Sequence, residues 1–265
     1  MHSRYSVVVS STDAFSDTWE PFFELMSVYW APTANVPIYL NSEHLGHTVD
    51  NLNIRNTRIG RFFPGRHPTW SQSIAAALSL IETEYVLYVQ DDYFLYAPVR
   101  SDVIEEAIDV MRVFGLAHVR LLDGTSDVIP GPHPMVETIT RRSRYYLSLQ
   151  AGLWHRRALA QLLRPHETPW EFELVGSHRA RVRRAQLTRL RRDTFHDRAD
   201  RVFPYEPTGI VKGRWERRIV EPLFQAHGLD VDFDVRGFTD ADTPGATSPK
   251  RPTLAKGLRR IRSLF

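Results

Sequence analysis

Short β-type apolar runs alternate with segments of helical spacing along most of the chain. The runs predict strands over Arg4–Ser11, Val36–Leu40, Tyr85–Tyr93, Val119–Leu122 and Tyr145–Leu149. Helical spacing predicts helices over Asp17–Trp30, Thr69–Ile81, Asp102–Phe114 and Arg156–Leu163. Strands that alternate with helices indicate one α/β domain with a mostly parallel sheet.

The second half of the chain is punctuated by cap and turn residues. Thr168, Pro169 and Glu171 form the pattern of a capping box and predict a helix that starts there. The pattern predicts short strands or a hairpin at 202–205 and 209–213, and a final helix at Trp215–His227. Segments 51–67 and 128–134 are rich in Gly, Pro and polar residues and are expected to be loops.

The most informative stretch is Tyr85–Leu95, an apolar run interrupted by the adjacent acids Asp91 and Asp92. Open α/β sheets bind ligands beyond the carboxyl ends of their strands, so these acids lie where chemistry is expected. Paired carboxylates can bind a hard divalent cation, which neutralises the phosphates of a nucleotide. A solvated turn is the alternative interpretation.

Composition bounds the class of protein. The 265 residues are 42% hydrophobic, enough for a substantial core, and no cysteine is present, which excludes disulfides and thiolate zinc sites. No apolar run is long enough for a membrane span. Histidines at metal-ligand spacing are absent, although His178 or His196 could add a ligand.

The positive net charge of +3 originates in the end of the chain, where residues 250–265 hold six Lys or Arg and no acid. The expected organisation is therefore a domain over 1–238 and a linker with a basic tail over 239–265. Leu254, Leu258, Ile261 and Leu264 form one apolar stripe in that tail, which suits an anionic membrane surface, with a disordered tail as the rival interpretation.

The order of these elements resembles the GT-A-type glycosyltransferases, which use nucleotide-sugar donors and carry a DxD-like motif. The resemblance is carried by Val7–Ser11, Trp70–Ile81, Tyr85–Tyr93 with the variant Gln90-Asp91-Asp92, and Pro169–Glu173. It implies a Rossmann-like, mixed and mostly parallel sheet flanked by helices.

The resemblance also implies site residues. Asp92 is expected to bind Mn²⁺ or Mg²⁺ and Asp91 to support it, while Gln90 replaces the first acid of the motif. Glu173 is expected to be the base of an inverting enzyme. Ser11, Asp13, Glu43, Arg61 and Lys212 are expected at the nucleotide-sugar, although a helix cap and a strand-end charge explain Asp13 and Glu43 almost as well. Trp154 and Trp170 are candidates to stack on a sugar.

The function expected from these observations is sugar transfer to a glycan or lipid-linked acceptor in polysaccharide biosynthesis, by a cytoplasmic protein peripheral to the inner membrane face. A sugar-1-phosphate nucleotidyltransferase is one alternative, although the Gly-rich phosphate loop expected after the first strand is absent. A non-catalytic basic adaptor that binds membrane or nucleic acid is the other. For the enzyme, no nucleic-acid partner is expected.

Overall fold

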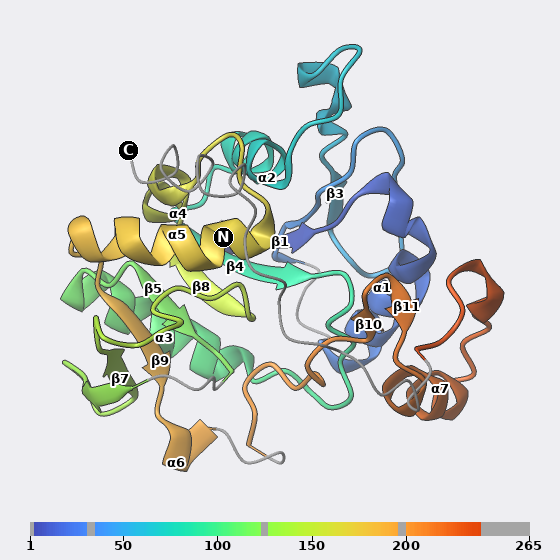
Figure 1. Ribbon diagram of the computed structural model, residues 1–265. Helices are drawn as coiled ribbons and strands as arrows, with labels where there is room; N and C mark the ends of the chain where they lie inside the picture. The colour runs from blue at the N-terminus through green and yellow to red at the C-terminus, as the bar shows by residue number, and fades with distance from the viewer. Residues whose placement is uncertain (1–2, 31–34, 123–126, 196–199, 240–265) are drawn as a thin grey trace.

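The computed structural model describes residues 3–30, 35–122, 127–195 and 200–239 (Figure 1). The predicted tail and His196 lie outside these ranges. The described residues contain a nine-stranded sheet in the order β3-β2-β1-β4-β8-β5-β9-β7-β6. Its strands are β1 Tyr5–Ser10, β2 Ile38–Leu40, β3 Ile54–Asn56, β4 Tyr85–Gln90, β5 His118–Arg120, β6 Val128–Pro130, β7 Val136–Ile139, β8 Gly152–His155 and β9 Leu187–Leu190.

The sheet is mixed and mostly parallel, as the alternation of elements predicted. β3, β2, β1 and β4 are parallel neighbours, β8 runs antiparallel between β4 and β5, and β9 is parallel to β5. At the far edge, β7 is antiparallel to both β9 and β6. A two-stranded hairpin of β10 Ile210–Val211 and β11 Arg214–Trp215 lies apart from this sheet.

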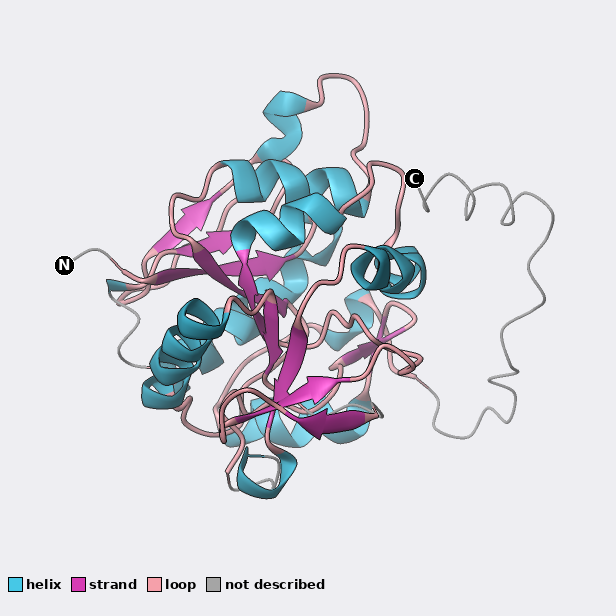
Figure 2. Cartoon of the chain, turned by 90° about the vertical axis from the view of Figure 1, so that its left-hand side faces the viewer, coloured by secondary structure: helices cyan, strands magenta, loops and turns pink. Residues whose placement is uncertain are grey.

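Helices cover both faces of the sheet in a single domain (Figure 2). They are α1 Trp19–Tyr29, α2 Trp70–Ser79, α3 Ser101–Phe114, α4 Arg156–Leu162, α5 Pro169–Val182, α6 Arg192–Phe195 and α7 Arg217–Ala226. Short 3₁₀ segments occur at η1 Asp13–Thr18, η3 Ile59–Phe62 and η4 Phe233–Val235. In the described ranges, no helix is long and apolar enough to cross a membrane.

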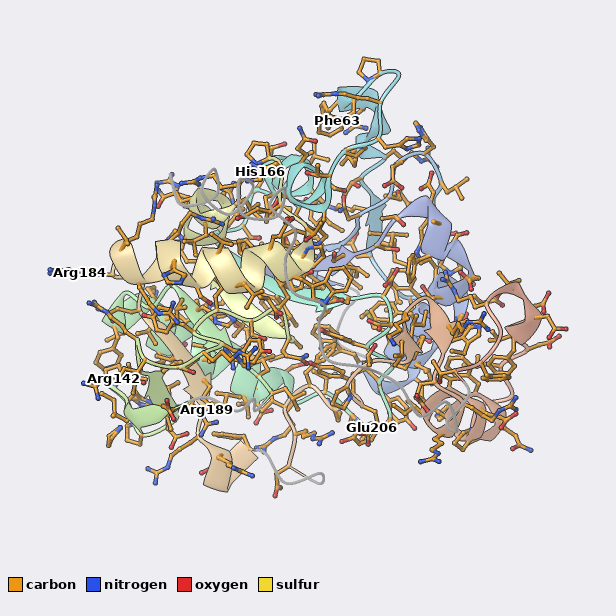
Figure 3. All side chains as sticks on the ribbon, viewed as in Figure 1. Phe63, Arg142, His166, Arg184, Arg189 and Glu206 are labelled. Atoms are coloured by element: carbon orange, nitrogen blue, oxygen red, sulfur yellow. The ribbon has the colours of Figure 1, made fainter. Side chains whose placement is uncertain are left out.

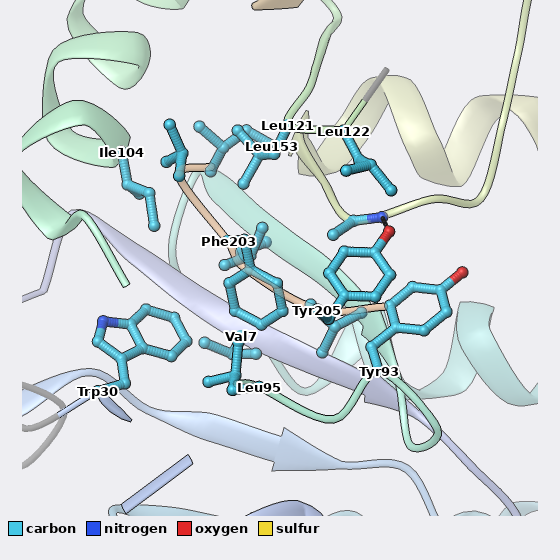
Figure 4. Packing of buried hydrophobic residues seen from close by; sticks show 14 of the residues in the cluster. Val7, Trp30, Tyr93, Leu95, Ile104, Leu121, Leu122, Leu153, Phe203 and Tyr205 are labelled. Carbon is cyan, nitrogen blue, oxygen red and sulfur yellow. Dashed lines mark hydrogen bonds between the residues drawn. The ribbon is translucent and has the colours of Figure 1, made fainter. Parts of the chain in front are cut away.

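Two apolar clusters follow from the alternation of side chains along a strand. Val7 and Val9 of β1 pack with residues of α1, α3 and α7 on one face, while Val8 packs with residues of α2, α4 and α5 on the other. The first cluster continues to the ligand edge, where the rings of Tyr93 and Tyr205 lie together (Figure 4). Trp19, Phe22 and Trp30 belong to this core.

Several local predictions were wrong. Segment 51–67 contains β3 and η3, and 128–134 contains β6, so neither is a simple loop. No strand forms over Tyr145–Leu149, because side chains bind its backbone in place of a neighbouring strand: Leu147 N–H donates to Ser177 Oγ at 3.0 Å and Leu149 N–H to Glu173 Oε1 at 2.8 Å. Residues 202–205 also form no strand and make one isolated bridge, from Tyr205 to Leu95.

Candidate functional site

The carboxyl ends of β1 and β4 meet at one edge of the sheet. The two strands pair in parallel, with Ser10 opposite Gln90, so that the residues after them also lie side by side. Asp91 N–H donates to Ser10 carbonyl oxygen at 3.3 Å, and Ser11 Oγ donates to Asp91 Oδ2. Ser11 Oγ in turn accepts from Trp19 Nε1 at 2.7 Å. A buried serine therefore holds the first acid of the pair in place.

The second acid is held by the segment that leads into the β10–β11 hairpin. Thr208 Oγ1 donates to Asp92 Oδ2 at 2.6 Å, and Gly209 N–H donates to the Asp92 carbonyl oxygen at 3.0 Å. Gly209 must be a glycine here, because a Cβ atom would overlap the ring of Phe94. The other carboxylate oxygen, Asp92 Oδ1, is buried and accepts no hydrogen bond from the described residues.

Both carboxylates are nearly inaccessible, at 6% exposure for Asp91 and 8% for Asp92. Burial, followed by the adjacent charge of Asp92, raises the pKa of Asp91 well above its usual range, against the hydrogen bond from Ser11 and the charge of Arg236. Burial also raises the pKa of Asp92, which the Thr208 hydroxyl opposes. Two buried like charges are costly, and a bound cation would relieve that cost.

The residues present fit a divalent cation in part. Asp92 Oδ1 is the kind of unsatisfied oxygen that Mn²⁺ or Mg²⁺ takes as a ligand. In the described part of the chain, no three His, Asp or Glu residues gather as a ready-made metal site. A cation at Asp92 would therefore need further oxygens from water or from a substrate phosphate.

Gln90 and Glu173 both bind the backbone of one residue, Leu149, although they are far apart in sequence. Glu173 Oε1 accepts from Leu149 N–H at 2.8 Å and from Ser148 Oγ at 3.2 Å. On the other side, the Leu149 carbonyl oxygen accepts from Gln90 Nε2 at 3.3 Å and from Tyr93 OH at 3.2 Å. Leu149 thus connects the acid pair at the end of β4 with the carboxylate on α5.

The sequence of α5 explains why Glu173 is available for this contact. The predicted capping box is confirmed: Thr168 Oγ1 accepts from Glu171 N–H, and the Glu171 side chain accepts from Thr168 N–H at 2.9 Å. Because Glu171 is occupied at the helix end, Glu173 is free to point at Leu149. The capping box accordingly fixes which of the two glutamates faces the ligand edge.

Tyr93, Tyr205 and Gln150 also lie at this edge and were not predicted as site residues. The Tyr93 and Tyr205 rings stack with their centroids 4.2 Å apart, and Tyr205 OH donates to Gln150 Oε1 at 2.6 Å. Ala151 N–H donates back to the Tyr205 hydroxyl oxygen at 3.1 Å. The aromatic residue directly after the acid pair was the available signal, whereas the long-range partner Tyr205 had none.

Asp13 and Glu43 bind one another's backbone at the ends of β1 and β2. Glu43 Oε2 accepts from Asp13 N–H at 2.6 Å, and Asp13 Oδ1 accepts from Glu43 N–H at 3.0 Å. Asp13 also accepts from His44 and Leu45 N–H groups. Arg61 lines a shallow recess with Glu43, His44, Arg58 and Gly60. These contacts build a connected wall beside the acid pair.

Lys212 lies at the exposed tip of the predicted hairpin, which the structure confirms. Lys212 and Gly213 both have positive φ, at 51° and 81°, as a two-residue hairpin turn requires. Because Thr208 and Gly209 attach the base of this segment to Asp92, the hairpin that carries Lys212 is anchored at the acid pair.

The two tryptophan candidates have opposite outcomes. Trp154 is fully buried in β8 and stacks on His118 with centroids 4.0 Å apart, so the prediction that it stacks on a sugar is wrong. Trp170 is 73% exposed at the start of α5 and remains a candidate. His178 is an exposed residue of α5.

No protein-family profile matches this sequence, and no curated protein matches it significantly. Solved structures share part of its arrangement. S. aureus TarS 1–349 in complex with UDP-GlcNAc is 13% identical, with 71% of this chain and 56% of that chain covered and a TM-score of 0.48. Glucosyl-3-phosphoglycerate synthase from Mycobacterium tuberculosis in complex with phosphoglyceric acid is 13% identical, with 89% and 81% covered and a TM-score of 0.44.

The bifunctional IspDF from Campylobacter jejuni is 12% identical, with 77% of this chain and 52% of that chain covered and a TM-score of 0.41. This chain spans about half the length of the TarS and IspDF chains that it matches. With every one of these TM-scores below 0.5, the likeness concerns general architecture and says nothing of chemistry.

Proposed function

We propose that this chain is a glycosyltransferase that moves a sugar from a nucleotide-sugar donor to a glycan or lipid-linked glycan. The observation that carries the proposal is the backbone of Leu149, whose N–H binds Glu173 and whose carbonyl oxygen binds Gln90. One edge of the sheet thereby offers a buried acid pair for a donor and a separate carboxylate for an acceptor. Sugar transfer needs these two functions.

Glu173 is the proposed base. Both of its hydrogen bonds from the described residues go to Oε1, so Oε2 remains to accept the proton of the attacking hydroxyl. Leu149 N–H and the Ser148 hydroxyl orient the carboxylate. A single positioned base supports direct attack on the anomeric carbon and hence inversion.

The acid pair is proposed to serve the donor. A divalent cation at Asp92 would neutralise the charge that builds up on the leaving diphosphate, with Asp91 as the supporting acid. Lys212, on the hairpin anchored at Asp92, is proposed to approach the same phosphates. Ser11 holds Asp91, while Asp13, Glu43 and Arg61 form the proposed wall for the nucleoside.

Trp170 is proposed to contact the acceptor sugar. The basic tail is proposed to hold the protein at an anionic membrane.

Glu173→Gln tests the proposed base. The amide oxygen can still accept from Leu149 N–H, so the fold is kept, but the side chain no longer takes a proton. We expect sugar transfer to fall by about 10²–10⁴-fold, measured by release of nucleotide with a panel of nucleotide-sugars. The variant should still bind the donor nucleotide, measured as a thermal shift with nucleotide diphosphates and Mn²⁺.

Glu171→Gln is the matched control, since it makes the same change two residues away on the same helix. A glutamine still completes the capping box, so this variant should transfer sugar at nearly the wild-type rate. Undiminished turnover in Glu173→Gln, or equal loss in both variants, would remove the assignment of Glu173. A chain that binds no nucleotide diphosphate in the presence of Mn²⁺ would refute the proposed function itself.

A further inference from the structure

Residues 61–67 form a finger that projects from the body of the protein at the ligand side of the sheet. Figure 3 shows Phe63 near its tip, and Figure 1 shows η3 standing above α2. The tip is a tight turn: Arg66 N–H donates to the Phe63 carbonyl oxygen at 3.2 Å, Pro64 occupies the second position, and Gly65 has a φ of 69°. This Pro-Gly pair suits a type II turn, so the finger has a defined conformation.

The finger combines the exposed ring of Phe62 and the half-buried ring of Phe63 with arginines. Phe62 is 46% exposed, the Arg61 guanidinium lies 4.9 Å from its ring centroid, and the Arg66 guanidinium lies 5.1 Å from that of Phe63. Residues 51–81 contain four arginines and no acid. Stacking on the rings keeps the charged groups beside the apolar tip.

An open apolar groove runs along the base of the finger. It is lined mainly by Phe62 and Phe63 of the finger, Ala75 and Ala76 of α2, and Ala160 and Leu163 at α4. Small alanines on α2 and aromatic rings on the finger leave a trough that apolar chains can enter. An exposed apolar patch of this kind marks an interaction surface.

The finger is connected to the proposed acceptor side. Thr69, which follows it, donates from Oγ1 to the Pro165 carbonyl oxygen at 2.5 Å. Trp70 packs its ring against Phe172 with centroids 5.2 Å apart, and its Nε1 donates to Ser10 Oγ at 3.1 Å. The segment that follows the finger is therefore packed against the first turn of α5, the helix that carries the candidate base.

We propose that the 61–67 finger docks into the surface of an anionic lipid bilayer, with Phe62 and Phe63 among the acyl chains and Arg66 at the phosphates. Charge selects this partner: the basic tail, which also carries an apolar stripe, would be repelled by the arginines around the groove, whereas anionic headgroups complement them. Docking here would present the edge of Glu173 to an acceptor held in the membrane, a consequence that rests on the proposed function.

Vesicle flotation tests the finger directly. The full-length chain carries Leu258→Ser and Ile261→Ser, which remove half of the apolar stripe of the tail, and is compared with and without Phe62→Ser and Phe63→Ser. The charge of the tail is the same in every variant, so a difference between them reports on the finger. We expect the finger substitutions to lower partitioning onto phosphatidylcholine vesicles containing phosphatidylglycerol by roughly tenfold, because two aromatic rings lose their burial. Val113→Ser with Phe114→Ser, two exposed apolar residues at the end of α3, is the matched control and should leave partitioning unchanged.

A fluorescent label then locates the contact. The chain has no cysteine, so Phe62→Cys and, separately, Val113→Cys each provide one site for an environment-sensitive dye. The dye at position 62 should brighten on anionic vesicles, and the dye at position 113 should not. No change at position 62, or equal partitioning of finger and control variants, would overturn the proposal. Equal binding to pure phosphatidylcholine would overturn its charge selectivity, and none of these outcomes depends on sugar transfer.

Discussion

At the residue scale, burial of the acid pair lowers the free energy of unfolding above the ordinary pKa of an aspartate. Burial and the charge of Asp92 raise the pKa of Asp91, so between the ordinary pKa of an aspartate and this raised value the unfolded chain is ionised while the folded chain is protonated. The free energy of unfolding therefore falls as pH rises through that window and stays lowered above it. Above the ordinary pKa of an aspartate, the folded protein is therefore less stable than it would be with a neutral side chain at position 91.

Asp91→Asn should consequently stabilise the ligand-free protein. The amide oxygen still accepts from Ser11 Oγ and carries no charge beside Asp92. We expect the melting temperature to rise by about 2–4 °C at neutral pH, with the gain disappearing as the pH approaches the ordinary aspartate value. Thermal unfolding measured across that pH range checks this expectation. A gain that is independent of pH would mean that packing, and not ionisation, produced it.

The sequence predicted that the acid pair and Glu173 belong to one site, but not the atoms that lie between them. In the sequence, Leu149 is simply the last residue of the β-type run Tyr145–Leu149. Its N–H and carbonyl oxygen bind side chains of Glu173, Gln90 and Tyr93, which come from elements distant in sequence. No local pattern records such contacts. Trp154 failed for a related reason, since its burial depends on β4 and β5 on either side of β8.

At the element scale, α2 and α5 begin with the same device. Thr69 with Gln72 and Thr168 with Glu171 both form complete capping boxes. Only α5 carries the candidate base one turn later. Substitutions of the two capping threonines can therefore distinguish the effect of a weakened helix end from the effect of a disturbed site.

Thr168→Ala and Thr69→Ala should each lower the free energy of unfolding by about 1 kcal/mol, because each leaves a backbone N–H at a helix end without its acceptor. Only Thr168→Ala should also reduce sugar transfer, since the first turn of α5 orients Glu173 toward Leu149. Chemical denaturation and turnover measured side by side test this. Equal loss of turnover in both variants would show that general stability, and not the position of Glu173, limits the rate.

Elements with strong local signals were predicted, whereas three short strands were not. The long amphipathic α3 ends where expected, at Gly115 with a left-handed φ of 62°. Strands β6, β7 and β9 contain three or four residues each, and β9 lies within an arginine-rich stretch, so neither length nor apolar pattern reveals them. These strands are held by their pairing with one another, which no pattern in their sequences predicts.

At the scale of the whole molecule, the arginine run 179–192 is not a uniform solvated face. Arg179 is buried in an ion pair with the equally buried Glu167 at 2.5 Å, and Arg189 pairs with Glu137 at 3.0 Å. Arg181 donates to the backbone of the segment before β8, at Arg141 and Ser143. These arginines bind α5 and β9 to the rest of the fold. A sequence shows the run of charges, while only the topology shows which partners reach them.

His118 is a further buried ionisable group whose titration changes the stability of the whole domain. His118, in the middle of the sheet, is fully buried against Trp154, and neither ring nitrogen has a hydrogen-bond partner among the described residues. Burial, followed by the charge of Arg120, lowers its pKa well below the usual histidine range. The folded protein therefore keeps His118 neutral where the unfolded chain binds a proton.

His118→Leu should make the protein less sensitive to acid. For a histidine with a lowered pKa, stability is complete above the ordinary histidine value and is lost as the pH falls below it, by about 1.4 kcal/mol per pH unit until the folded pKa is reached. The variant lacks this proton uptake, so its free energy of unfolding should decline less steeply than that of the wild type over the same range. Denaturant unfolding at a series of pH values gives both slopes. Parallel slopes would show that His118 is protonated in the folded protein and that the sheet accommodates its charge. The lack of a hydrogen-bond partner for its ring nitrogens among the described residues argues against this outcome.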